Sequence, residues 1–198
     1  MNPELSRAQD EDWSWIQAFR EGDASAFERI FEKYQRLVIN LAFRFVRERA
    51  VAEDIAQEVF IKLYEKKLRL EPKAKFTTWL YRVTVNLTLD VLRKRKNVLR
   101  SLDETIGDPK GAKTTWLDKV ADPGAVSAKV LEGEEIQLIV QRAVHALPEK
   151  LKWPILLYQF EELPYKEIAT ILGISAKAVE RRIYHAKEAL RPLLSKYL

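Results

Sequence analysis

The chain has 198 residues, 47% of them hydrophobic and 32% charged, which is enough for one large or two small domains. It contains no cysteine, which excludes disulfides and thiolate metal sites. No apolar run approaches the roughly 20 residues that span a bilayer, so membrane insertion is not expected. The polar, acidic start MNPELSRAQDEDW is unlike a signal peptide. We therefore expect a cytoplasmic protein, and the scarcity of glycine (six residues) favours an all-helical fold.

The net charge of +5 is unevenly distributed along the chain. Residues 1–100 carry 20 Lys/Arg against 15 Asp/Glu, residues 101–135 carry 4 against 8, and residues 136–198 carry 10 against 6. Two basic halves flank an acidic middle, which favours nucleic acid as the partner of both halves. Ordinary surface variation accounts for the charges equally well, so charge alone leaves both interpretations open.

Three helices are predicted in the first half. Asp23 is a suitable N-cap for a helix whose apolar residues recur at helical spacing as far as Phe45. A second helix should begin near Ala50, and Pro72 marks the loop that follows it. The third runs from Phe76 to about Lys96.

Periodicity then fails between Asn97 and Ser127, where glycine and proline gather. A stretch of this length does not belong inside a compact domain, so it is predicted to be a linker. Ser127 can cap a helix that ends at Pro148, and a further helix spans Glu149 to Glu162, bent or started late at Pro154. The fold class expected is all-α, with two small helical domains, residues 1–96 and 128–198, joined by an acidic flexible linker at 97–127.

The end of the chain, Pro164 to Leu190, has the parts of a helix-turn-helix in order. Gly173 can adopt the positive φ of a tight turn, and Ser175 can cap the second helix. The outer face of that helix is left to polar and mostly basic residues: Lys177, Glu180, Arg181, Tyr184, His185 and Lys187. Such a helix suits the DNA major groove. An ordinary helical hairpin with a solvated face is the alternative, which spacing alone makes less favoured but does not exclude.

The helix from Phe76 combines aromatic residues with a basic end. This composition suits single-stranded DNA, because cations follow phosphates while aromatic faces or a pocket receive an unstacked base. Trp79 shares a face with Val83 and Leu87, so a core position is favoured over a DNA contact. The polar stripe of this helix consists of Thr78, Arg82, Asn86 and Arg93, and Arg82 and Asn86 are the better candidates for contact.

Four segments in order carry a family resemblance: DIAQEVFIKLY, FTTWLYRVTVN, ALPEKLKWPILLYQFEELPYKEIATILGIS and a closing basic helix. The chain resembles the small bacterial ECF (extracytoplasmic function) sigma factors of the sigma-70 family, from about Gly22 to Leu194. The resemblance implies a promoter-reading subunit of RNA polymerase rather than an enzyme, with no cofactor and no metal. It also implies core polymerase (the β′ clamp helices and the β flap), promoter DNA and an anti-sigma factor as partners.

The resemblance assigns three groups of residues. The polymerase group, which would bind the β′ clamp helices, is Asp54, Gln57, Glu58, Lys62 and Leu63. The −10 group, which would capture the non-template strand of the −10 element, is Lys73, Lys75, Phe76, Thr77, Arg82, Asn86, Arg93 and Arg95. The −35 group, which would lie near the −35 duplex, is Ser175, Lys177, Glu180, Arg181, Arg182 and His185.

Two positions of the −35 group depart from the family pattern. Many relatives carry Arg or Lys where this chain has Glu180, and Arg where it has His185. A glutamate can accept a hydrogen bond from cytosine N4, whereas an arginine there would read guanine. The preferred −35 sequence is therefore expected to differ from the commonest one.

Two other functions remain to be compared. A stand-alone helix-turn-helix transcriptional regulator would explain the C-terminal half but leaves the helix from Phe76 without a purpose. A helical enzyme would use Glu53, Asp54 and Glu58 as metal ligands or acid–base groups. It is disfavoured because the only two histidines, His145 and His185, lie far apart in sequence.

Overall fold

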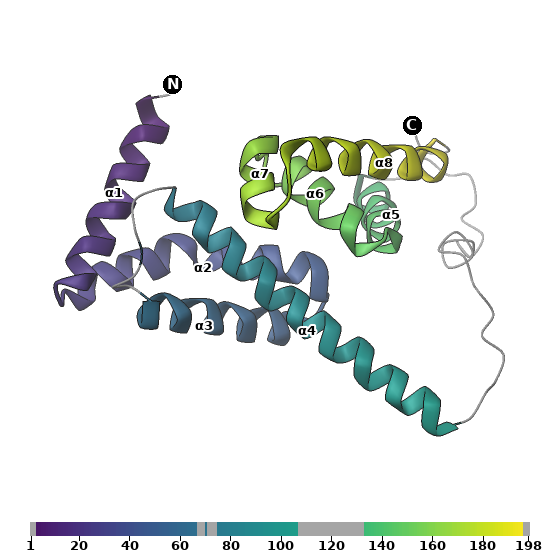
Figure 1. Cartoon of the computed structure of the whole chain (residues 1–198), viewed down its shortest axis with the longest axis horizontal. Coiled ribbons are helices and arrows are strands. Elements are labelled where there is room, and N and C mark those ends of the chain that lie inside the picture. The colour runs from purple at the N-terminus through teal and green to yellow at the C-terminus, as the bar shows by residue number, and fades with distance from the viewer. Residues whose placement is uncertain (1–2, 67–69, 71–74, 107–132, 196–198) are drawn as a thin grey trace. The chain divides into compact units, whose positions relative to one another are not determined.

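The computed structural model describes residues 3–66, 70, 75–106 and 133–195, and every regular element within these ranges is an α-helix (Figure 1). The chain divides into two compact units, Met1–Gly107 and Asp108–Leu198. The all-α prediction is therefore confirmed. None of the described helices combines the length and apolar character needed to cross a membrane.

Unit 1 contains four helices, α1 (Pro3–Arg20), α2 (Ala24–Val46), α3 (Arg49–Lys66) and α4 (Phe76–Ile106). Helix α1 was not predicted, because its first ten residues are mostly polar. Its helical pattern is visible only in the second half, where the apolar residues Trp13, Ile16 and Phe19 recur every three residues. Ile16 and Phe19 are buried, so α1 packs its last two turns against the rest of the unit.

Helix α2 begins where the sequence predicts. The Asp23 carboxylate accepts hydrogen bonds from the backbone N–H of Ser25 at 2.9 Å and from its hydroxyl at 2.7 Å. These bonds lower the pKa of Asp23. The helix ends at Arg47, which adopts a left-handed conformation with φ 60° and donates its N–H to the Phe43 carbonyl. The chain then turns directly into α3, which places α2 and α3 side by side.

The core of unit 1 lies between α2, α3 and α4. Val38 from α2, Val59 from α3 and Leu80 from α4 have no exposed surface, and each contributes about 1.5–3 kcal/mol of burial free energy. One residue of the predicted polar stripe on α4 is misplaced, since Thr78 is buried rather than exposed. The buried face continues with Thr84, whose hydroxyl bonds back to the Leu80 carbonyl at 2.8 Å. A hydroxyl paired in this way can enter a core without leaving a polar group unsatisfied.

Helix α4 is longer than predicted and continues to Ile106 through the first part of the predicted linker. The segment 97–106 contains no glycine or proline, and its apolar residues Val98, Leu99 and Leu102 retain helical spacing. The boundary of unit 1 therefore lies about ten residues beyond Lys96. The rest of the predicted linker, with the Ser127 cap, lies outside the described residues.

Unit 2 is built from α5 (Gly133–Ala146), α6 (Glu149–Gln159), α7 (Tyr165–Leu172) and α8 (Ala176–Leu194). Buried residues from all four helices form its core: Ala143, Val144, Leu147, Trp153, Leu156, Leu157, Ile168, Ile171, Val179, Ile183 and Ala186. The second predicted helix of this domain ends at Gln159 instead of Glu162, which takes a positive φ of 50°.

The turn between α7 and α8 has the predicted chemistry. Gly173 takes φ 65° and ψ 36°, a left-handed conformation that glycine adopts without a Cβ penalty. The Ser175 hydroxyl oxygen then accepts the N–H of Ala178 at 3.2 Å and caps α8. Helices α7 and α8 thus form the helix-turn-helix that the sequence predicts.

Candidate nucleic-acid and protein interfaces

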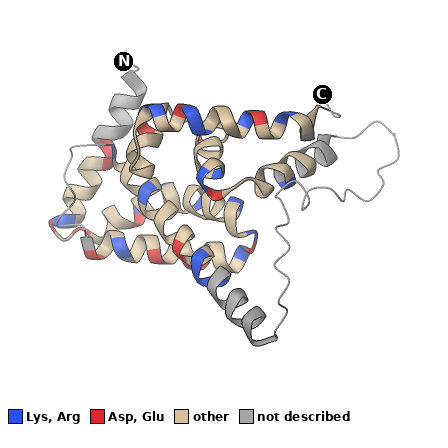
Figure 2. Cartoon of the chain, turned by 45° about the vertical axis from the view of Figure 1, so that its right-hand side comes forward, with Lys and Arg blue, Asp and Glu red and all other residues tan. Residues whose placement is uncertain are grey.

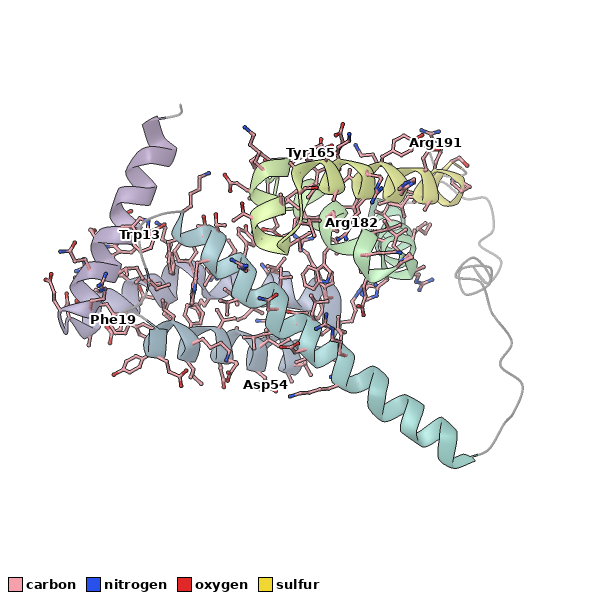
Figure 3. The ribbon with its side chains drawn as sticks, viewed as in Figure 1. Trp13, Phe19, Asp54, Tyr165, Arg182 and Arg191 are labelled. Carbon is pink, nitrogen blue, oxygen red and sulfur yellow. The ribbon has the colours of Figure 1, made fainter. Side chains whose placement is uncertain are left out.

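One face of α3 gathers most of the polymerase group. Asp54 and Gln57 are exposed, and Glu58 and Lys62 are half-buried and paired, with Lys62 Nζ 3.0 Å from Glu58 Oε1. Figure 3 labels Asp54 on the outer side of the helix. These four side chains lie within about two turns, so a partner meets them together.

Leu63 does not belong to this face. Its side chain is 0% exposed and packs in the core of unit 1, so it has no surface to offer a partner. The apolar residue that points outward is Ile61, which is 50% exposed. Its position, four residues after Gln57 and seven after Asp54, was the available signal, because helical residues at that spacing share a face. We correct the polymerase group by replacing Leu63 with Ile61.

Two aromatic side chains with exposed surface, one from α2 and one from α3, lie near the end of α3 that follows Ile61. Tyr64 of α3 is largely exposed, and its ring lies 5.9 Å from that of Phe27 of α2. Phe31 is partly exposed and packs edge-on against Phe60, with ring centroids 4.8 Å apart. We call Phe31 and Tyr64 the aromatic patch. Exposed apolar surface of this kind typically marks a binding face.

Part of the −10 group follows one side of α4. Arg82, Asn86 and Arg93 are exposed and recur at spacings of four and seven residues, so they follow one stripe. Thr77 and Lys75 are half-buried at the start of the helix. Lys73 lies outside the described residues.

Phe76 was expected to touch DNA, but its side chain is 0% exposed. Its ring is enclosed by three others: those of Tyr34 at 5.5 Å, Trp79 at 5.9 Å and Trp13 at 6.4 Å between centroids. The residue therefore anchors the first turn of α4 in the core. Trp79 stacks on it and is half-buried against the same core, which confirms the core position favoured for that residue.

Arg95 is already paired in the isolated chain. Its Nη1 lies 2.7 Å from Glu48 Oε1 and its Nη2 lies 3.0 Å from Glu48 Oε2, a bidentate pair that joins the start of α3 to α4. The pair lowers the pKa of Glu48 and raises that of Arg95. A phosphate would have to compete with Glu48 for this guanidinium. Arg93 has a longer contact, 3.5 Å from Asp90, and is the more accessible cation.

The −35 group lies on α8 and its N-cap Ser175, and Figure 2 shows the Lys and Arg positions of this helix in blue. All of its members are exposed except Arg182, which is half-buried. The structure adds Tyr184, which is 61% exposed, with its ring 5.6 Å from that of His185. The sequence placed Tyr184 on the outer face, but no charge singled it out for binding. Its exposure now makes it a candidate for contact with a base edge.

Glu180 lies at the edge of this surface, beside α7. Its charge and the neighbouring Tyr158 help to raise the pKa of Tyr165, although desolvation of that hydroxyl is the main cause. The rings of Tyr158 and Tyr165 lie 5.3 Å apart, and Lys187 Nζ lies 5.0 Å from the Tyr158 ring. Lys187 is thus directed toward α6. Nearest the start of α8, the exposed cations are Lys177 and Arg181.

Two of the three acids considered for an enzymatic site, Glu53 and Glu58, form surface ion pairs. Glu53 Oε1 lies 2.6 Å from Arg49 Nε, and Glu58 pairs with Lys62. The two histidines belong to different helices, α5 and α8. Among the described residues, no three or more His, Asp or Glu side chains come together as a metal site would require.

Family models match both units. The description "Sigma-70 region 2" matches residues 30–98, which cover α3 and most of α2, as well as α4 up to Val98. "Sigma-70, region 4" matches residues 137–190, which lie in α5 to α8. The polymerase group and the −10 group fall in the first match, and the −35 group falls in the second.

Relatives that align with most of the chain are also sigma factors. The ECF RNA polymerase sigma factor SigW of Bacillus subtilis is 35% identical over 90% of this chain and 94% of its own length. The RNA polymerase sigma-H factor of Pseudomonas aeruginosa is 32% identical, over 94% and 97%. The sigma-E factor of Escherichia coli is 31% identical, over 88% and 90%. The chain belongs to the ECF sigma factors of the sigma-70 family.

Solved structures share the fold at lower identity. CnrH, in complex with the cytosolic domain of CnrY, superposes with a TM-score of 0.67 at 19% identity and covers 95% of this chain and 99% of its own. RpoE of Bartonella quintana, in complex with the anti-sigma factor NepR, gives 0.63 at 17% identity, over 87% and 98%. As a family member, the chain is an RNA polymerase sigma factor. A stand-alone regulator is not favoured, because it would have no use for region 2.

Proposed function

We propose that the two units divide promoter recognition, with unit 1 holding polymerase and the melted −10 strand and unit 2 holding the −35 duplex. The observation that carries this division is that each family match coincides with one folded unit, and each unit exposes its own charged helix. The chain acts with core RNA polymerase in the bacterial cytoplasm and performs no catalysis of its own.

The surface for polymerase is the outer face of α3. Asp54, Gln57 and Glu58 would meet the β′ clamp helices, with Lys62 at the side and Ile61 between them. Exposed acids attract a basic partner and steer its approach, whereas a central apolar side chain supplies most of the affinity. The aromatic patch lies next to this face and would extend the contact toward the end of α3.

The start of α4 would receive the non-template strand. Thr77, Arg82 and Asn86 are the described side chains available to contact an unstacked base, with Lys75 beside them. The Asn86 amide has both donors and acceptors, so it can distinguish base edges, whereas arginines mainly bind phosphate. Extruding a base costs a few kcal/mol, which the polymerase contacts must help to offset.

Helix α8 would enter the major groove near the −35 element. Lys177 and Arg181 are the exposed cations at its leading end, and Tyr184 and His185 follow one turn later. Ser175 uses its oxygen as the N-cap, so its hydroxyl proton is the part available to a phosphate. Arg182, which is half-buried, would reach the flanking backbone. Glu180 would accept from a cytosine N4.

Unit 2 would also contact the β flap of polymerase, and an anti-sigma factor would hold the chain inactive when it is not needed. The support for the second partner is that CnrH and the Bartonella RpoE were both solved in complexes, with CnrY and with the anti-sigma factor NepR. An anti-sigma factor could act by covering the α3 face or the DNA-binding helices.

The test is transcription by core RNA polymerase with the purified chain on a library of promoter sequences. We expect initiation from a defined subset of sequences only when the chain is present, with enriched bases in two blocks that correspond to the −10 and −35 elements. Specific duplex binding by the chain alone, with no initiation when polymerase is added, would support a stand-alone regulator instead.

A further inference from the structure

Helix α1 is fixed to unit 1 by a buried carboxylate. Asp12 is only 3% exposed, and its two oxygens accept the Tyr34 hydroxyl at 2.6 Å and Lys33 Nζ at 2.7 Å. Burial and this hydrogen bond raise the pKa of Tyr34 well above its ordinary value. Lys33 Nζ also lies 5.0 Å from the centre of the Trp15 ring. A carboxylate buried with both partners in place holds α1 in one position, because any other position would leave a charge unpaired.

From this position α1 contacts Leu70, between α3 and α4, and the first residue of α4. Arg20 Nη1 donates to the Leu70 carbonyl across 3.4 Å, and Leu70 is itself buried. The Trp13 ring meets Phe76 edge-on, at 6.4 Å and 78° between planes. Figure 3 shows Trp13 where α1 comes near the start of α4.

Phe76 transmits this contact to the candidate DNA surface. It is the first residue of α4, it is fully buried, and Thr77 follows it directly. Its ring stacks on Trp79 within 19° of parallel. Because α4 is one rigid helix, a shift at Phe76 would move Thr77, Arg82 and Asn86 together relative to the rest of unit 1.

We infer that α1 sets the position of the −10 surface, with Trp13 and Arg20 as positioning residues that act through Phe76 and Leu70 without touching DNA. The inference rests on the proposed function of α4. It assigns a role to the helix that lies before the region 2 match, which begins at residue 30.

The experiment measures binding of holoenzyme, assembled from core polymerase and each variant, to two single-stranded oligonucleotides. One carries the −10 sequence selected from the promoter library and the other carries the same bases in scrambled order. The ratio of the two affinities is the readout. A variant that only lowers the folded fraction weakens both affinities alike and leaves the ratio unchanged.

Trp13→Leu and Arg20→Ala should each lower this ratio, by up to about tenfold, because an aromatic pair or a single hydrogen bond is worth up to ~1.5 kcal/mol. Trp13→Phe and Arg20→Lys should restore most of it, since they retain a ring or a donor. The matched controls are Gln17→Ala at an exposed position of the same helix and Arg36→Ala on the exposed side of α2, which should keep the wild-type ratio.

A wild-type ratio for both Trp13→Leu and Arg20→Ala would overturn the inference, as would an equal loss in the two controls. Asn86→Ala separates this failure from that of the proposed function. If Asn86→Ala lowers the ratio while the α1 variants do not, only the positioning role is wrong. If Asn86→Ala leaves it unchanged as well, the assignment of the −10 surface to α4 is wrong.

Discussion

At the scale of single residues, the surroundings of a side chain decide its role more than its residue type does. Arg93 and Arg95 lie two positions apart on α4, yet Arg95 is held by Glu48 in a bidentate pair while Arg93 has one long contact. Leu63 and Ile61 are both aliphatic residues of α3, yet one is buried and the other half exposed. The sequence could not separate Arg93 from Arg95, because the difference depends on the tertiary contact with Glu48. For Leu63 and Ile61, the helical spacing from Asp54 and Gln57 was the available signal.

Glu180→Arg should change the base preferred at one −35 position. In the proposed contact, the wild-type carboxylate would accept from cytosine N4, whereas an arginine would donate to guanine O6 and N7, a difference of about 1–3 kcal/mol between bases. Selection of −35 duplexes by the holoenzyme measures it. Glu149→Arg, an exposed site at the start of α6, makes the same charge change as a control. Identical base preferences in wild type and Glu180→Arg would contradict the contact.

The Glu48–Arg95 pair should make the stability of unit 1 depend on pH. The folded-state pKa of Glu48 lies below its ordinary value of 4.5. Its contribution is therefore fully present above that ordinary value and disappears as the pH falls through the lower folded pKa. Urea unfolding of wild type and Glu48→Gln should give different stabilities at neutral pH that converge in acid. A difference that persists unchanged below the folded pKa would show that the pair is not its source.

At the scale of elements, the sequence predicts where a helix begins better than how far it continues. Asp23 and Ser175 cap their helices as expected, because an N-cap is a local hydrogen bond that the residue type encodes. By contrast, α1 consists largely of polar residues and gains stability from packing that only the fold reveals. The end of α4 was placed too early, since a polar composition hid its continuing helical spacing. Such elements depend on tertiary contacts or length rather than on local signals.

Helix α3 offers a matched pair of substitutions that separates binding from stability. Ile61→Asp should weaken the affinity for core polymerase about tenfold or more, because it puts a charge into the apolar centre of the interface, while leaving unfolding nearly unchanged. Leu63→Ala should do the opposite and cost about 2–5 kcal/mol of stability through a core cavity. Polymerase titration and urea unfolding of both variants measure the two effects. If Ile61→Asp binds as tightly as wild type, the α3 face is not the polymerase surface.

At the scale of the whole molecule, each half of the chain folds as its own unit with its own charged helix. The basic halves predicted from the charge pattern correspond to unit 1 and unit 2, and the family matches fall one on each. In the sequence, the predicted boundary between the halves is marked by a break in helical periodicity. The burial of Phe76 could not be predicted from the sequence, because an aromatic residue beside a basic loop suits both a DNA contact and a core position until its neighbours are known.

The central claim is that the two units carry out different steps at one promoter, and paired measurements on the holoenzyme test it most directly. Binding to a −35 duplex is measured by titration, and opening of the −10 region by the fluorescence of 2-aminopurine placed in the non-template strand. Asn86→Ala should slow opening while leaving duplex affinity close to wild type. Lys177→Ala with Arg181→Ala should weaken duplex binding, more so at low salt than at high, because losing phosphate contacts reduces the counterion release that drives binding at low salt. On promoters already saturated with holoenzyme, the same pair should open DNA at the wild-type rate. Equal effects of both sets on both measurements would contradict the division of labour.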